Sequence, residues 1–286
     1  MFGKRTVFLY GLFIIVLVIN KHARAETVED LDISKSIDLE TPVGSSTSFL
    51  SNGTFKFSTG FDYSSGKYGN IGETEIWYVP VSMGYQQKKW KAKISIPWVR
   101  ITGPGGITGE GEVINPDTAK TTSVATESGL GDIVTSLSYS FNSFGVNLPL
   151  IDLTTKIKFP TANENKGLGS GEYDFTIQSD LYKPLGKLTL MGMLGYKFKG
   201  DPPGRDLNNV IKASVGASYK FNDQYSSGMF VDFQEATSQN TDDVIDLFTY
   251  LTWRMHKSIT LTGYGAVGFT DGTPDKEIGL QIGYKK

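Results

Sequence analysis

Apolar and polar residues alternate along most of this chain, and this period of two constrains the fold more than any other feature. In residues 54–63, TFKFSTGFDY, one side of an extended chain carries Phe55, Phe57, Phe61 and Tyr63, while the other carries polar or small residues. No later segment shows a sustained 3.6-residue period or an apolar run long enough for a membrane-spanning helix. The sequence therefore predicts strands with one dry face and one wet face.

Twelve such segments follow one another, each of about ten residues, which is the length that a tilted strand needs to cross a hydrocarbon core. An even number of strands returns both chain ends to the same side of a barrel. We expect the strands to begin near residues 54, 76, 90, 132, 151, 173, 187, 210, 225, 245, 259 and 277.

The expected connections alternate in length. The long ones are residues 64–73, 102–130, 160–172, 200–208, 235–243 and 271–276, and the short ones are residues 87–89, 142–149, 183–186, 222–223 and 255–258. This alternation is typical of the surface loops and periplasmic turns of an outer-membrane barrel. The loop 102–130 is long enough to fold into the barrel or to form a surface feature.

Tryptophans distinguish a lipid-facing wall from the inner face of a soluble sandwich. Trp77, Trp90, Trp98 and Trp253 all fall on the apolar face and all lie near strand ends. Rings at two rims with aliphatic residues between them form the girdle pattern of a membrane wall. Because an open sheet edge in lipid leaves backbone groups unpaired, the fold class predicted is an all-β transmembrane antiparallel up-and-down β-barrel of about twelve strands, over residues 54–286.

The first 25 residues resemble an export signal. Lys4 and Arg5 precede the apolar run of residues 7–19, and an A-x-A cleavage site ends at Ala25. An uncleaved anchor helix is the alternative, although the run is short for one. A cleavable signal peptide (1–25) places the protein in the bacterial outer membrane, since such barrels belong there. Residues 26–53 form a polar segment that either enters the barrel as a plug or lies in the periplasm.

The polar face is the informative one for function, because it faces the inside of a barrel. Its charged members are the candidate pore-lining residues: Lys56, Asp62, Lys91, Lys93, Asp132, Asp152, Lys156, Lys158, Asp174, Asp180, Lys197, Lys212, Asp232 and Asp246. Tyr78, Phe230, Phe248, Tyr250 and Tyr264 are the candidate inner aromatics. Two interpretations stay open: a hydrated pore with a field across its waist, and an internal salt-bridge network that fills the barrel. Small inner residues, among them Gly84, Gly216, Gly228 and Gly279, favour open space.

Four short motifs resemble a known family. They are Gly129-Leu130-Gly131-Asp132 at the start of a strand, Phe159-Pro160-Thr161 at the end of one, the glycines between Gly167 and Gly171, and Gly195-Tyr196. On these residues the chain resembles the outer-membrane transporter family of the MetA pathway of phenol degradation. The resemblance implies a barrel that passes small molecules, aromatic ones among them, and it implies no catalytic residue.

Little in the sequence indicates an enzyme. Beyond residue 25 the only histidine is His256, which falls in a short turn, and the GLGSG segment (167–171) has no histidine partner or following helix. No calcium-binding loop pattern occurs, cysteine is absent, and no basic patch suggests nucleic acid. We therefore predict no catalytic site, no metal and no cofactor, with outer-membrane lipid and a small-molecule solute as partners. The predicted function is a passive channel for small solutes, aromatic or apolar ones included; the alternative is a non-conducting structural or surface-binding barrel.

Overall fold

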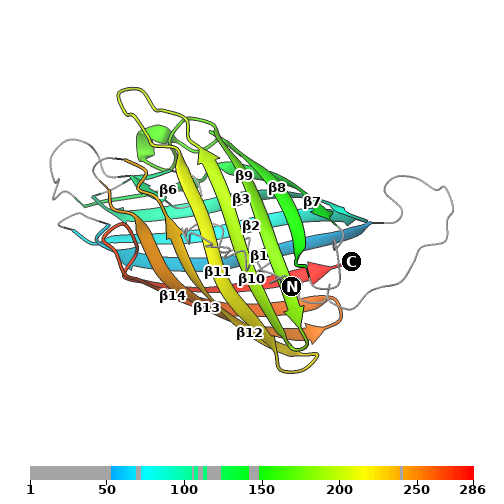
Figure 1. Cartoon of the computed structure of the whole chain (residues 1–286). Coiled ribbons are helices and arrows are strands. Elements are labelled where there is room, and N and C mark those ends of the chain that lie inside the picture. Colours follow the sequence, from blue (N-terminus) through cyan, green and yellow to red (C-terminus); the bar gives the residue numbers. More distant parts are fainter. Residues whose placement is uncertain are drawn as a thin grey trace, which may run out of the picture.

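The protein is a β-barrel with its strands inclined to the barrel axis (Figure 1). The computed structural model describes residues 53–68, 72–104, 106–108, 112–114, 124–141, 148–238 and 241–286. Its elements are β1 (Thr54–Gly66), β2 (Thr74–Gln87), β3 (Trp90–Gly103), β4 (Gly106–Thr108), β5 (Glu112–Ile114), β6 (Ala125–Leu130), β7 (Ile133–Phe141), β8 (Leu150–Phe159), the 3₁₀ helix η3 (Glu164–Lys166), β9 (Asp174–Leu185), β10 (Leu188–Phe198), β11 (Val210–Lys220), β12 (Tyr225–Gln234), β13 (Val244–His256), β14 (Ile259–Gly268) and β15 (Lys276–Lys285).

Sequential strands pair antiparallel, and β1 pairs with β15 to close the sheet. At the closure the backbone N–H of Phe55 donates to the carbonyl of Lys286 at 3.1 Å, and the N–H of Lys286 donates back at 2.9 Å. Strands β6 and β7 both pair with β3, one after the other, so that they occupy a single place in the sheet. Twelve strand positions therefore surround the barrel, which confirms the predicted number.

A bulge separates β6 from β7. Trp98 pairs with Leu130, whereas Ser95 pairs with Val134, so that the two residues between them on β3 face three on the other chain segment. Gly131 stays attached because its N–H donates to the carbonyl of Pro97 at 2.9 Å. A proline has no N–H to give to a ladder, and a bulge is one of the places where a sheet tolerates it.

The connections divide between the two ends of the barrel as expected. Long loops follow β1, β3, β8, β10, β12 and β14, and we call their end the mouth; at the opposite, short-turn end, tight turns join β2 to β3, β9 to β10, β11 to β12 and β13 to β14. The expectation that residues 102–130 form one loop is wrong at both ends, because β3 continues to Gly103 and β6 begins at Ala125. Backbone pairing beyond the predicted rims extends this hairpin past the others, and β4 pairs with β5 above it. The expected signal peptide, and the polar segment up to residue 52, lie outside the described residues.

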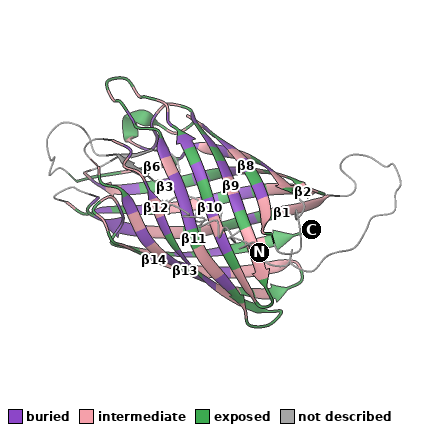
Figure 2. Cartoon of the chain, viewed as in Figure 1, coloured by how far each residue is buried: buried purple, intermediate pink, exposed green. Residues whose placement is uncertain are grey.

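The two faces of the sheet differ sharply (Figure 2). Exposed apolar side chains point outward along every barrel strand, and buried polar ones point inward. The four tryptophans are on the outer face, between 39 and 52% exposed. In a soluble protein this outer surface would be unfavourable, but a bilayer covers such a surface. Among the described residues, no helix is long and apolar enough to cross a membrane.

Candidate functional site

The inside of the barrel, which we call the bore, is the candidate functional site, and its side chains lie in rows. Residues paired across neighbouring strands point to the same face, so each inner position continues into the next strand along the hydrogen-bond direction. Because the strands are inclined, such a row winds from the short-turn end toward the mouth. Three rows hold most of the predicted site residues: an aromatic double row, an acidic row with Asp152, Asp180, Asp232 and Asp246, and a basic row with Lys56, Lys93, Lys156 and Lys197.

The aromatic double row covers β9 to β15 and continues onto β1 and β2. Its first line joins Tyr182, Met191, Gly216, Phe230, Phe248 and Ala266. Its second joins Ser218, Gly228, Tyr250, Tyr264, Gly279, Asp62 and Tyr78. The rings of Phe230 and Phe248 lie 6.4 Å apart, and that of Tyr264 lies 5.7 Å from Phe248. Four of the five predicted inner aromatics thus form one buried cluster.

Glycines explain how these rings are arranged. A Cβ on Gly228 would collide with the ring of Tyr250, and a Cβ on Gly279 would collide with the ring of Tyr264. Each ring therefore lies across a glycine of the neighbouring strand. Tyr250 reaches over it to donate to Ser218 Oγ at 2.9 Å. These glycines do not leave open space, as their small size suggested, but let rings lie flat against the wall.

Tyr264 repeats the arrangement on the other side of the cluster. Its ring crosses Gly279 on β15, and its hydroxyl is hydrogen-bonded to Asp62 on β1. Tyr78, the fifth predicted aromatic, pairs with Asp62 across the next strand and is partly buried against the mouth. The tyrosine line therefore carries the aromatic surface from β13 to β2.

Buried charges converge at the mouth. Lys158 Nζ lies 3.5 Å from Asp132 Oδ2 and 3.2 Å from Asp174 Oδ2, and Lys197 Nζ lies 3.5 Å from the same Asp174 oxygen. All four side chains are at most 2% exposed. Buried charges persist only when paired, so the loss of one member of this cluster would leave another with less compensation. At the mouth, these charges therefore form an internal salt-bridge network, which is one of the two interpretations of the sequence.

The loop between β8 and β9 is attached to that cluster by its motif residues. Lys158 donates to Ser170 Oγ at 2.7 Å, and the N–H of Ala162 donates to Asp132 Oδ1 at 2.9 Å. Thr161 Oγ1 accepts the N–H of Ile133 at 2.9 Å just beyond the bulge. Three of the four motifs noted in the sequence therefore meet at one place. Gly167 and Gly171 have φ of 66° and 76°, a backbone conformation that glycine adopts without steric cost.

Leu168 of the same loop was missed by sequence reasoning. It is 1% exposed and packs inside the mouth against Tyr68, Ile76, Val99 and Ile101. The three strand residues occupy inward positions in the alternating pattern, which could have identified them. Nothing in the loop sequence indicates that its leucine turns inward.

The remaining predicted pore-lining residues lie on the inner face at various depths. Asp152, Lys156, Asp180, Lys212, Asp232 and Asp246 are buried, whereas Lys56, Asp62, Lys91 and Lys93 are partly exposed. Most have a partner on the wall. Lys91 Nζ lies 2.8 Å from Asp152 Oδ2, Gln178 donates to Asp180 at 2.8 Å, and Ser214 donates to Asp232 at 2.6 Å.

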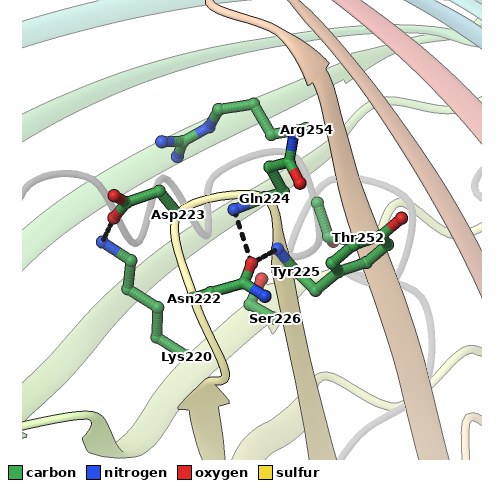
Figure 3. A pocket seen from close by; sticks show the side chains of 8 residues that line it. All are labelled: Lys220, Asn222, Asp223, Gln224, Tyr225, Ser226, Thr252 and Arg254. Carbon is green, nitrogen blue, oxygen red and sulfur yellow. Dashed lines mark hydrogen bonds and ion pairs between the residues drawn. The ribbon is translucent and has the colours of Figure 1, made fainter.

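A groove at the short-turn end is lined by Lys220, Asn222, Asp223, Gln224, Tyr225, Ser226, Thr252 and Arg254 (Figure 3). Its contacts account for the turn between β11 and β12. Asn222 Oδ1 accepts the N–H groups of Gln224 at 2.8 Å and Tyr225 at 2.9 Å. The Lys220 ammonium, 2.7 Å away, lowers the pKa of the exposed Asp223 carboxyl. We assign this groove to turn formation.

His256 is exposed where β13 ends, and its Nδ1 accepts the N–H of Ser258 at 3.4 Å. Within the described ranges, no three His, Cys, Asp or Glu side chains gather in a way that could hold a metal ion. The geometry of the bore therefore directs attention to solute passage.

Comparisons with known proteins agree with the barrel geometry. Residues 76–284 match the family described as "Putative MetA-pathway of phenol degradation". The COG4313 outer membrane channel from Pseudomonas putida F1 is a similar solved structure, with a TM-score of 0.64 and 12% identity over 86% of this chain and 100% of that one. The beta domain of the Bordetella autotransporter BrkA has a TM-score of 0.50 and 10% identity over 82% of this chain and 99% of that one. No curated protein matches the sequence. These structural likenesses establish the fold.

Proposed function

Because the chain belongs to the "Putative MetA-pathway of phenol degradation" family, we propose that it is an outer-membrane channel for the passive passage of small solutes that carry an aromatic ring. The observation that supports this most is the aromatic double row. A closed barrel in lipid has no structural need for rings on both faces, yet this one carries a girdle outside and a tyrosine–phenylalanine cluster inside.

The inner rings are suited to weak, repeated contact with a flat apolar solute. Tyr250 and Tyr264 pack over glycines of the neighbouring strands, and the rings of the cluster are at most 7% exposed, so contact with a solute requires these side chains to move apart. Offset and edge-to-face ring contacts contribute about 0.5–1.5 kcal/mol each, which is enough to select a solute without retaining it. Conduction requires binding of that weak, multi-site kind. Neither a cofactor nor an energy source enters this mechanism.

A second function is favoured by the mouth. Leu168, Tyr68 and the buried ion pairs pack inside the entrance, as expected of a non-conducting barrel whose loops bind a partner. The two functions differ in one measurable property, which is permeability.

Proteoliposome swelling with phenyl β-D-glucoside tests the proposal, with cyclohexyl β-D-glucoside as the matched non-aromatic solute. We expect swelling with both, faster for the phenyl compound. Replacing Phe248 with leucine, which keeps an apolar residue of similar size, should reduce the difference between the two rates. Vesicles that never swell would exclude the channel and favour the non-conducting barrel.

We also propose that residues 1–25 are removed on export and that residues 26–53 remain in the mature protein at the periplasmic side. The charge pattern of the first 25 residues and the common side of Thr54 and Lys285 in the barrel support this arrangement. Mass spectrometry of protein purified from outer membranes should give an N-terminus at Glu26. An intact Met1 there would favour the anchor helix.

A further inference from the structure

The short-turn end of the barrel is strongly basic, whereas the mouth is acidic. Eleven basic side chains, which we call the basic rim, and two acidic ones lie in the described residues 54–56, 86–91, 138–141, 148–152, 183–187, 220–226, 252–258 and 283–286 of the short-turn end. Eight basic and sixteen acidic side chains lie in the described residues 64–68, 72–76, 99–104, 124–133, 157–175, 197–211, 233–238, 241–246 and 267–278 of the mouth. Because the basic rim is assembled from separate turns, no run of basic residues in the sequence indicates it.

Part of the basic rim faces the bore. Lys220 and Arg254 lie at inward positions, because they alternate along β11 and β13 with Tyr219 and Trp253, which are exposed on the outer face. Both line the groove of Figure 3 together with Asp223, and both lower the pKa of its carboxyl, Lys220 more strongly. Two cations therefore act on one carboxylate, which leaves positive charge at the inner edge of this end. Lipid headgroups lie outside the wall, so an anion that meets this edge comes from the periplasm or from the chain itself.

The chain supplies an acidic segment at this same end. Residues 26–52 carry six acidic side chains and one basic one, a net charge of −5. They precede β1, whose first residue, Thr54, pairs with Gln86 beside the turn between β2 and β3. Twelve strands about 4.8 Å apart and inclined by about 40° form a barrel about 24 Å across. A flexible chain of about 27 residues has an end-to-end distance of about 30 Å, so a segment of this length reaches every part of the basic rim.

From this arrangement we propose that the basic rim is a docking surface for residues 26–52 of the same chain, which lie across the periplasmic opening of the bore when docked. Opposite charges provide the attraction, and the covalent link keeps the local concentration of the segment on the order of millimolar, so weak contacts suffice. Salt weakens them, because the Debye length falls from about 10 Å at 0.1 M to about 3 Å at 1 M. The inference rests on the proposed retention of residues 26–53 after export, and it does not depend on the identity of the solute.

Fluorescence anisotropy of a dye within the segment tests the docking. The chain has no cysteine, so Ser36→Cys provides a single labelling site. The labelled mature protein is measured in vesicles of phosphatidylcholine, which has no net charge, and mass spectrometry of the same sample verifies that it begins at Glu26. We expect high anisotropy in 0.1 M KCl, and in 1 M KCl a loss of about half of the excess over a free labelled peptide of residues 26–52.

The triple variant Lys220→Gln/Arg254→Gln/Lys257→Gln removes three charges from the basic rim. It should lower the anisotropy in 0.1 M KCl by a similar amount, because the segment loses part of its attraction. Lys67→Gln/Arg205→Gln/Lys276→Gln is the matched control, since it removes three charges at the mouth, and it should leave the anisotropy unchanged. Retention of heat-modifiable electrophoretic mobility shows that each variant is folded.

Four results would overturn the docking surface. They are a mature protein that lacks the segment, an anisotropy in 0.1 M KCl that equals that of the free peptide, a rim variant that matches the wild type, and a mouth variant that loses as much anisotropy as the rim variant. Complete release of the segment when phosphatidylglycerol replaces part of the phosphatidylcholine would assign the basic rim to lipid headgroups instead. A protein that docks its segment but passes no solute would overturn only the proposed channel, so the two proposals fail separately.

Discussion

Lys158 and Lys93 point to the same side of the same sheet, but their surroundings differ. Lys158, at the mouth, is 2% exposed, lies within 3.5 Å of two carboxylates and donates to Ser170. Lys93, nearer the short-turn end, is partly exposed, and small residues, Gly84 and Ser136, flank it in its row. Burial therefore separates an inner charge that ties a loop to the wall from one that is partly open to the bore.

The comparison divides the bore into two regions with different requirements. At the mouth, paired charges hold a loop inside the barrel, and removing Lys158 takes the ion pair from Asp132 and leaves Asp174 with Lys197. Nearer the short-turn end, charges and rings line the wall. We expect their replacement to change the permeation of solutes more than the stability of the barrel. The predictions below test this division, from the largest expected effect to the smallest.

Lys158→Met should destabilise the barrel by about 3–5 kcal/mol, because Asp132 and Asp174 then lose their shared cation while still buried. The free energy of unfolding in urea, followed by the mobility shift between folded and unfolded barrel, measures this loss. Lys93→Met is the matched control and should cost less than about 1 kcal/mol. If both variants lost the same free energy of unfolding, the mouth and the region nearer the short-turn end would not differ as proposed.

Leu168→Ala should cost about 2–3 kcal/mol, since it empties a fully buried site against Val99 and Ile101. We expect the loss to appear mainly as release of the loop. Proteolysis within residues 160–173 of the intact protein reports it. Leu185→Ala, at an exposed outward position, provides the comparison. Unchanged protease resistance of the loop would show that Leu168 does not anchor it.

Gly228→Ala should cost about 1–2 kcal/mol and alter conductance, because the new Cβ displaces the ring of Tyr250 from the wall into the bore. Gly84→Ala is the control on the same inner face. Its Cβ would meet its nearest neighbour at 3.6 Å, an ordinary contact. If both alanines changed the single-channel conductance alike, the flat packing of the rings would not be what sets the width of the bore.

Asp223→Asn should produce no measurable change in stability, since the Asp223 side chain is 92% exposed and water screens its pair with Lys220. Lys220 lowers the pKa of Asp223, so the pair is complete above the ordinary aspartate pKa and is lost only as the pH falls through the lowered value. Melting curves at pH 7 and pH 4 should match those of the wild type. A change in melting temperature at either pH would show that this ion pair contributes to the stability of the barrel.

Most of the fold follows from the alternating pattern, because a period of two fixes which face each side chain occupies. It assigns Trp77 outward and Ile76 inward without any knowledge of the partner strand. The bulge at Gly131 is different, since pairing beyond it depends on Pro97 in another strand. The extension of β6 to Ala125 was missed for that reason.

The site was less predictable, because its organisation depends on the register between strands. The sequence places Gly228 and Tyr250 on the inner face, but only their pairing shows that the ring lies over the glycine. Likewise, Lys56 and Lys156 are far apart in sequence and share a row only through the strands between them. Leu168 lies in a loop, where no period indicates direction.

Single-channel recording of the purified protein in planar bilayers tests the central claim most directly, which is that this closed barrel has a continuous wet bore. We predict discrete conductance steps in KCl that become larger when Leu168 is replaced with alanine at the mouth. A correctly folded barrel that inserts into the bilayer and yet produces no steps, with or without that replacement, would contradict the account.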